Sequence, residues 1–156
     1  MILKKQILEA QEKWGNGVVQ IGNLKSNREA CEQYTAEFLK TLYAFEDSSV
    51  LFKPTKTARE QFRNTKEGAL SYFIAGNDNF SEDDGFALAP WTKVRFENAG
   101  FIFEEKRALV MGNYFFTNEH GQEVKVEYTF GYQLTDDGNL KIDVHHSSFP
   151  FNPDLA

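Results

Sequence analysis

The residues best suited to acid–base chemistry stand near the end of the chain, where His145 and His146 are adjacent. Neighbouring residues on a strand point to opposite faces, so the two histidines cannot bind one metal ion. Alternation places His146 on the apolar face with Ile142 and Val144, and it leaves His145 on the polar face. A histidine on an apolar face can act as a general acid or base, or it can be a hydrogen-bonded core residue. His146 is therefore the residue predicted to be catalytic if the protein is an enzyme.

Aromatic side chains supply the predicted binding surface. The chain contains 15 Phe, 6 Tyr and 2 Trp residues, and a core built from such large rings often encloses a cavity. The aromatic residues predicted to contact a ligand in this cavity are Trp14, Phe38, Tyr72, Trp91, Tyr114 and Tyr128. The alternative for each tyrosine is a structural role, because a buried hydroxyl commonly finds a hydrogen-bond partner nearby.

Other kinds of site find less support in the sequence. Acid–base chemistry of the isomerase type needs a carboxylate in an apolar pocket, and the candidates are Glu97, Glu127 and Asp143. Glu127 and Asp143 fall on polar strand faces, which indicates solvated charges. The acidic segment 77–90 lacks the spacing of a calcium-binding loop, and the single cysteine, Cys31, excludes a cysteine-clustered zinc site. We predict no metal and no cofactor.

Size and charge limit the partners. The chain has 156 residues, a length that favours one domain spanning 1–156. Its 23 acidic and 17 basic residues give a net charge of −6, which repels phosphate backbones, so nucleic acid is excluded as a partner. The opening segment becomes charged after two apolar residues, and no apolar run reaches the roughly 18 residues of a membrane span. We therefore expect no membrane contact and a cytoplasmic location.

The first half of the chain has helical periodicity. Apolar residues recur every three or four positions over 3–23 and again over 27–45, as on helices with one buried stripe. Ser26 begins a capping-box pattern before the second of these helices. Asn64 is the predicted cap of a third helix over 65–75. Three helices are thus predicted before residue 76.

The second half has the pattern of a sheet. A short strand over 50–52 precedes the third helix, and the segment 77–90 has no periodicity and is predicted to be a loop. Four runs rich in Val, Phe, Tyr and Thr follow, at 91–104, 107–117, 122–134 and 140–149. The short turns between them predict an antiparallel meander. A bulge at 98–100 would bend this sheet so that it curls around the helices.

This order of elements resembles the nuclear transport factor 2-like (cystatin-like) superfamily of α+β cones. Residues 137–150 resemble the closing strand of calcium/calmodulin-dependent protein kinase II association domains and their bacterial relatives, in which a His-x-Ser step precedes a proline. His146 and Ser148 match that step. The resemblance implies three N-terminal helices packed on a curled antiparallel sheet, with a pocket between them. It also implies a homodimer or higher homo-oligomer formed through the outer face of the sheet.

The resemblance leaves two functions open, because members of this superfamily include enzymes such as ketosteroid isomerase and the SnoaL-like cyclases as well as binding modules. The first is a small-molecule-binding domain with an aromatic pocket, active as a cofactor-free isomerase, dehydratase or cyclase. In that case His146 carries the proton and Tyr114 or Tyr128 donates a hydrogen bond to an oxyanion. The second is a non-catalytic association module. Its working surface would be the outer sheet face with Lys125, Glu127, Thr129, Lys141 and His145.

Overall fold

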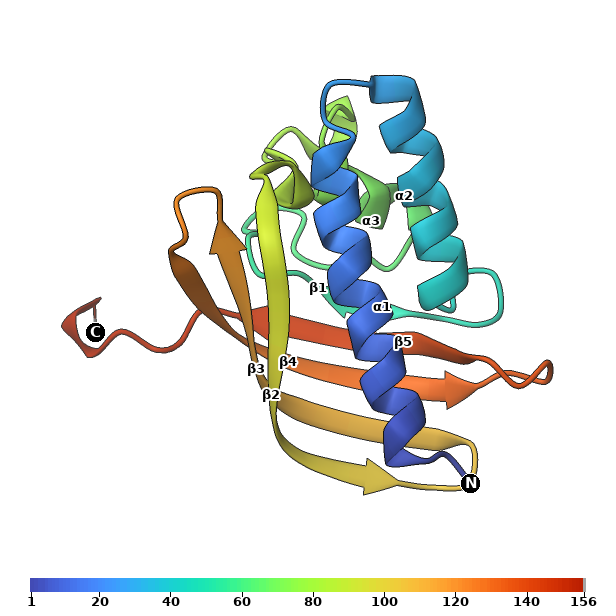
Figure 1. Cartoon of the computed structure of the whole chain (residues 1–156). Coiled ribbons are helices and arrows are strands. Elements are labelled where there is room, and N and C mark those ends of the chain that lie inside the picture. Colours follow the sequence, from blue (N-terminus) through green and yellow to red (C-terminus); the bar gives the residue numbers. More distant parts are fainter. Residues whose placement is uncertain (156) are drawn as a thin grey trace.

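The computed structural model describes residues 1–155, and its framework is a curved five-stranded sheet with helices on one face (Figure 1). The strands are β1 (Leu51–Lys53), β2 (Trp91–Phe103), β3 (Arg107–Asn118), β4 (Glu123–Leu134) and β5 (Leu140–Ser148). Their order in the sheet is β1-β5-β4-β3-β2. Strands β2 to β5 form the predicted antiparallel meander, whereas β1 pairs parallel to β5, so the sheet is mixed. The predicted α+β class and its three helices are confirmed.

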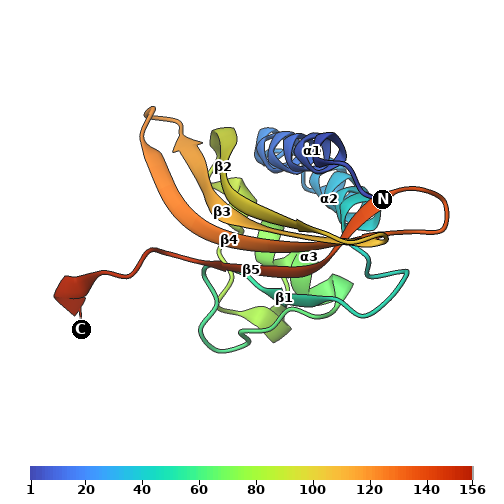
Figure 2. The same ribbon diagram turned by 90° about the horizontal axis from the view of Figure 1, so that it is seen from below.

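The three helices follow the predicted ranges closely. They are α1 (Lys4–Asn23), α2 (Arg28–Leu42) and α3 (Lys66–Ile74). The predicted caps are each wrong by one residue, because Asn27 accepts from the backbone N–H of Ala30 at 3.1 Å and Thr65 accepts from that of Gly68 at 3.1 Å. Figure 2 shows α1 on the concave side of the sheet, where its buried stripe packs against β2. The core therefore lies between the three helices and the sheet.

Two of the three register shifts in the sheet bear on the position of the site. The predicted bulge in β2 is confirmed by a shift in pairing with β3 between Asn98 and Gly100. A second bulge, not predicted, lies in β5, where Gly131 pairs with Val144 but the next residue, Tyr132, pairs with Ile142. Asp143 is thus left without a partner on β4, and a single extra residue reverses the face on which every later side chain of β5 lies.

The segment 77–90 contains two short 3-10 turns, Asp78–Phe80 and Phe86–Leu88, rather than the irregular loop predicted for it. Asp83 anchors it through two hydrogen bonds of 2.7 Å from the fully buried guanidinium of Arg63. Glu82 accepts from the backbone N–H groups of Ala58 and Glu60 at 2.7 and 2.8 Å. These contacts hold the segment beside α3 and the end of β1.

Candidate active site

A small cavity lies inside the cone, between the end of β1, helix α3 and strands β3 and β5. Its volume is about 10 Å³, close to the space that one water molecule needs. Most of its lining is apolar, and polar atoms come from a few side chains. The lining residues are Trp14, Phe52, Pro54, Thr55, Tyr72, Phe73, Phe86, Tyr114 and His145. An apolar cavity with a few convergent polar groups is the usual form of a small-molecule site.

A continuous chain of hydrogen bonds runs behind this cavity. The indole Nε1–H of Trp14 donates to the Tyr43 hydroxyl at 3.0 Å, and that hydroxyl lies 2.8 Å from Nδ1 of His145. Nε2 of His145 lies 3.1 Å from the Tyr114 hydroxyl, which donates to Ser147 Oγ at 2.6 Å. Ser147 Oγ in turn shares a short hydrogen bond with Thr55 Oγ1. Thr55 thereby connects a buried network to the cavity.

Burial keeps the members of this chain neutral. Desolvation, with a smaller contribution from the neighbouring His146, holds the pKa of His145 well below its usual range. Desolvation likewise raises the pKa values of Tyr43 and Tyr114 far above that of an exposed tyrosine. The His145 ring is sandwiched in aromatic contacts, stacking on Phe52 with centroids 4.7 Å apart. At neutral pH the network consists of uncharged donors and acceptors.

A wider hollow adjoins the cavity and shares Tyr72 and Phe86 with it. Its volume is about 380 Å³. The segment 82–89 forms one wall, and Lys25, Lys56 and Trp91 form the others. The Tyr72 hydroxyl accepts from the backbone N–H of Lys56 at 3.2 Å and also interacts with Thr55, so it lies beside the outer end of the buried network. The hollow and the cavity therefore lie on either side of Tyr72 and Phe86.

The prediction that His146 points into the pocket is wrong. His146 is exposed on the outer face of the sheet, and His145 is 2% exposed inside it. The cause is the bulge at Asp143. In a regular strand Ile142 and His146 share a face, whereas the extra residue places His146 on the face opposite to Ile142. For the same reason His145 does not belong to the outer working surface predicted for an association module.

The predicted aromatic residues are divided among three places. Trp14, Tyr72 and Tyr114 line the cavity, and Trp91 lines the adjoining hollow. Phe38 is buried against Trp14, with ring centroids 6.4 Å apart, and is not part of the cavity lining. Tyr128 lies behind Tyr114, where it accepts from the amide of Gln11 at 2.8 Å. Ligand contact by these residues stays a prediction.

Four polar residues of the site were missed, namely Tyr43, Thr55, His145 and Ser147. Two signals in the sequence bear on the last pair. The first signal is the His-x-Ser spacing, which occurs twice in the segment 145–148. The sequence comparison assigned it to His146 and Ser148, whereas the structure buries His145 and Ser147. Gly131, in the middle of a strand, is the other signal, because a strand glycine often marks a bulge or a close backbone approach.

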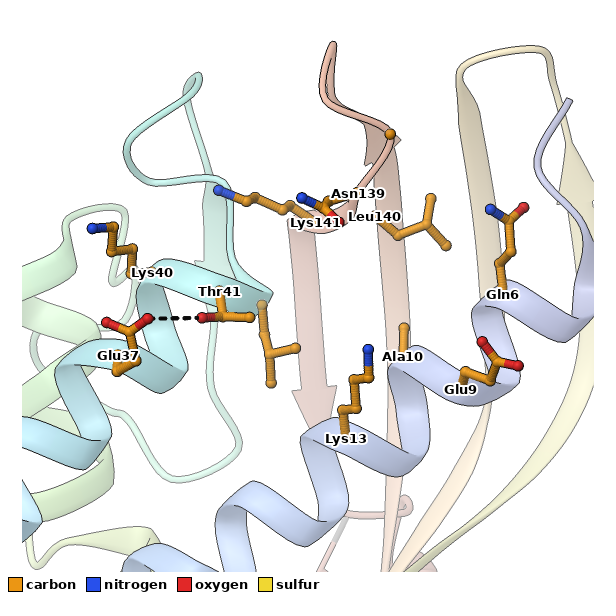
Figure 3. Close-up of a pocket in the computed structure, with 12 residues that line it drawn as sticks. Gln6, Glu9, Ala10, Lys13, Glu37, Lys40, Thr41, Asn139, Leu140 and Lys141 are labelled. Atoms are coloured by element: carbon orange, nitrogen blue, oxygen red, sulfur yellow. Dashed lines mark hydrogen bonds between the residues drawn. The ribbon is translucent and has the colours of Figure 1, made fainter.

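A second groove opens on the surface between α1, α2 and the start of β5 (Figure 3). Its volume is about 350 Å³. Figure 3 shows Lys13, Lys40 and Glu9 extending from the two helices, with Thr41 donating to Glu37 at 3.4 Å. None of these labelled side chains joins a buried polar network, so the groove lacks the chemistry of the inner cavity.

Residues 1–155 hold no group of three or more His, Cys, Asp and Glu side chains arranged to bind a metal ion. No helix in this range combines the length and the apolar character needed to cross a membrane. The predicted cytoplasmic location stays a prediction.

Comparison with known proteins gives a consistent match. The family model described as metal-independent carbonic anhydrase matches residues 5–149. A protein of that name from Nostoc sp. (strain PCC 7120 / SAG 25.82 / UTEX 2576) is 34% identical over 153 residues, which cover 96% of this chain and 75% of the relative. The crystal structure of a cyanobacterial iota-carbonic anhydrase complexed with bicarbonate superposes with a TM-score of 0.93. It is 34% identical and covers 97% of this chain and 94% of the other.

More distant structures share the fold alone. A protein described as a calcium/calmodulin-dependent protein kinase II association domain from Xanthomonas campestris has a TM-score of 0.65 at 17% identity, covering 96% of this chain and 89% of its own. Other matching structures are described as nuclear transport factor 2-like. These matches confirm the nuclear transport factor 2-like fold expected from the order of elements.

Proposed function

The chain belongs to the family of metal-independent carbonic anhydrases, and on that premise we propose that it catalyses the reversible hydration of CO2 to bicarbonate in the inner cavity. Water oxygen bonds to the carbon of CO2, one C=O electron pair moves onto oxygen, and the released proton passes to solvent. The observation that carries the proposal is a hydroxyl cluster facing an apolar cavity, in a fold that superposes closely on a bicarbonate-bound relative.

Family membership corrects the functions expected from the sequence. The predicted isomerase, dehydratase or cyclase activity and the non-catalytic association module are both wrong, because the family model covers residues 5–149 and the bicarbonate-bound relative matches almost the full chain. The prediction failed because fold does not determine function within this superfamily, and only the site does. The expectation of a small-molecule ligand agrees with the bicarbonate bound in the relative.

The walls of the cavity and of the adjoining hollow suit CO2, which is small, linear and without net dipole. The cavity alone has room for about one water molecule, so CO2 also occupies the inner end of the hollow beside Tyr72 and Phe86. Trp14, Phe52, Phe73 and Phe86 surround the space with ring faces and edges, and these surfaces desolvate an apolar gas molecule without competing for hydrogen bonds. We propose that CO2 enters through the hollow beside Tyr72 and Phe86. Exclusion of bulk water from so small a cavity also strengthens every electrostatic interaction inside it.

The hydroxyl groups suit the product. As water adds to CO2, negative charge develops on the carbonyl oxygens, and O–H donors already aimed at that position lower the barrier. Thr55 and Tyr72 line the cavity from two sides and both offer a hydroxyl there. Because desolvation raises the pKa of Tyr72 well above its usual range, this group stays protonated and keeps its donor at all physiological pH values.

Replacement of Ser147 tests this proposal. Ser147→Ala removes the hydroxyl that holds Thr55, and loss of one well-placed donor in such a site lowers kcat by about 10²-fold. Ser148→Ala is the matched control, because Ser148 is the next residue on β5 and lies on the outer face. Stopped-flow CO2 hydration with a pH indicator measures both variants. Equal activity in the two would contradict a catalytic role for this cavity.

We further propose that two copies associate through the outer face of the sheet, as expected from the sequence. This face carries an apolar hollow of about 470 Å³ along β2 and β3. Ile102 and Met111 stand in it with 59% and 57% of their surface exposed. Large exposed apolar side chains grouped on one face are typical of a protein interface.

A further inference from the structure

We propose that Tyr43, held by Trp14, sets the direction of every hydrogen bond in the buried network. The network then ends in an O–H group of Thr55 that is free to donate on the cavity side. Tyr43 and Trp14 are positioning residues in this proposal, and they do not touch the substrate. The direction follows from the donors and acceptors alone. Its consequence for bicarbonate binding rests on the function proposed above.

The first step concerns the Tyr43 hydroxyl. An indole Nε1–H is a donor only, so the 3.0 Å contact with Trp14 makes Tyr43 Oη an acceptor there. Over residues 1–155 the Tyr43 hydroxyl has one other hydrogen-bond partner, Nδ1 of His145 at 2.8 Å. Tyr43 is fully buried, so its own hydrogen must find a partner or cost the free energy of an unmade bond. The hydrogen is therefore donated to Nδ1.

The second step fixes the imidazole. A neutral imidazole carries one N–H, and a nitrogen that accepts a hydrogen bond cannot also carry it. Because Nδ1 of His145 accepts from Tyr43, the hydrogen resides on Nε2, which lies 3.1 Å from the Tyr114 hydroxyl. Burial favours this uncharged ring, since it lowers the pKa of His145. Nε2–H then donates to Tyr114 Oη.

The third step follows the hydrogen bonds from Tyr114 to the cavity. Tyr114 accepts from His145, and it donates to Ser147 Oγ at 2.6 Å. Ser147 now has its own hydrogen free, and the remaining partner is Thr55 Oγ1. Thr55 accepts that hydrogen and has its own left over. Since Thr55 lines the cavity beside Tyr72, this last hydrogen is free for donation on the cavity side, either to a ligand or to the Tyr72 hydroxyl.

Reversing the direction of these hydrogen bonds would leave the Tyr43 hydroxyl hydrogen without an acceptor. If Nδ1 of His145 carried the hydrogen, Tyr43 Oη would accept from both Trp14 and His145, and its own buried hydrogen would have no partner. A buried hydroxyl hydrogen without an acceptor destabilises this arrangement relative to the first. Thr55 thus keeps a hydrogen to donate on its side of the cavity, which favours small planar oxyanions such as bicarbonate, formate and nitrate.

Nitrogen-15 NMR of histidine-labelled protein reads the direction without any activity measurement. Long-range ¹⁵N–¹H spectra at neutral pH are expected to show His145 entirely as the Nε2–H tautomer. In Tyr43→Phe the Nδ1–H tautomer is expected to appear, because nothing then donates to Nδ1. The control is Tyr132→Phe, which also removes a buried tyrosine hydroxyl, but one without any hydrogen-bond partner among the described residues, and it should leave the Nε2–H tautomer unchanged.

The Nδ1–H form in the unmutated protein, or an unchanged spectrum in Tyr43→Phe, would overturn the proposal. The unmutated spectrum decides the question by itself if Tyr43→Phe does not fold. Formate binding supplies the second readout, and its dissociation constant should rise about tenfold in Tyr43→Phe but not in Tyr132→Phe, as loss of roughly one hydrogen bond implies. If the tautomer is as expected and no CO2 hydration is found, the proposed function fails while this inference stands.

Discussion

Burial governs the charge of His145, the residue at the centre of the network. The ring is 2% exposed and contacts aromatic rings, and its two nitrogens face the hydroxyls of Tyr43 and Tyr114. Neither hydroxyl can ionise to compensate an imidazolium, because burial raises both tyrosine pKa values. The folded protein therefore binds a proton at His145 less readily than the unfolded chain does.

This difference predicts a pH dependence of stability. The folded-state pKa of His145 is lowered from about 6.5, so below that pH the unfolded chain binds one more proton and the free energy of unfolding falls as pH decreases. The slope from this group reaches about 1.4 kcal/mol per pH unit. Urea unfolding between pH 7.5 and 5 should show that slope in the unmutated protein and in His146→Gln, but not in His145→Gln. Equal slopes in both variants would contradict the burial argument.

Among the elements, β5 positions the site, and its bulge at Asp143 determines which residues face inward. Arg107 on β3 binds Asp143 with a contact of 3.0 Å to Oδ1 and a shorter one to Oδ2, which holds the extra residue on the outer side. Gly131 lies opposite, and an added Cβ there would stand 2.9 Å from Cβ of Val144. The glycine therefore gives the bulged strand the room it needs.

Gly131→Ala tests this arrangement. The new methyl group must displace Val144, so we expect a loss of about 1–3 kcal/mol in the free energy of unfolding and a matching loss of CO2 hydration as His145 moves. Gly100→Ala, also a strand glycine, has no atom within 4 Å of the added Cβ and should be neutral or slightly stabilising. Guanidinium unfolding of both variants measures the difference. A neutral Gly131→Ala would show that the bulge does not need this glycine.

Strand β5 also shows which features of the fold and the site can be predicted from sequence alone. The bounds of β2 to β5 were predicted within one residue at each end, because long apolar alternation and short turns define them. The inward-facing residues of the site were not predicted correctly. A bulge adds one residue without changing the composition of the strand, and in β5 this extra residue turns His145 inward in place of His146. Thr55 could not be found either, because its contact with Ser147 spans 92 residues and depends on the parallel pairing of β1.

At the scale of the whole molecule, the proposed dimer forms through the outer face of the sheet. If two copies pair there, Met111→Lys places a charge in the apolar hollow and should shift the protein to monomer. Leu8→Lys is the control, because Leu8 is 43% exposed but lies on α1. Size-exclusion chromatography with light scattering at micromolar concentration distinguishes the two. A monomer in the unmutated protein would refute the proposed dimer.

The parallel pairing of β1 with β5 also has a consequence for the time course of folding. Residues 51–53 pair with residues 144–146, so one of the longest loop closures in the chain must occur before Thr55 meets Ser147. Non-local contacts of this kind form slowly, because the entropy of closing the loop is lost before the contact repays it. A refolding or nascent chain can hold its helices and the β2–β4 meander and still have no binding cavity. Recovery of catalysis is thus expected to lag behind recovery of secondary structure.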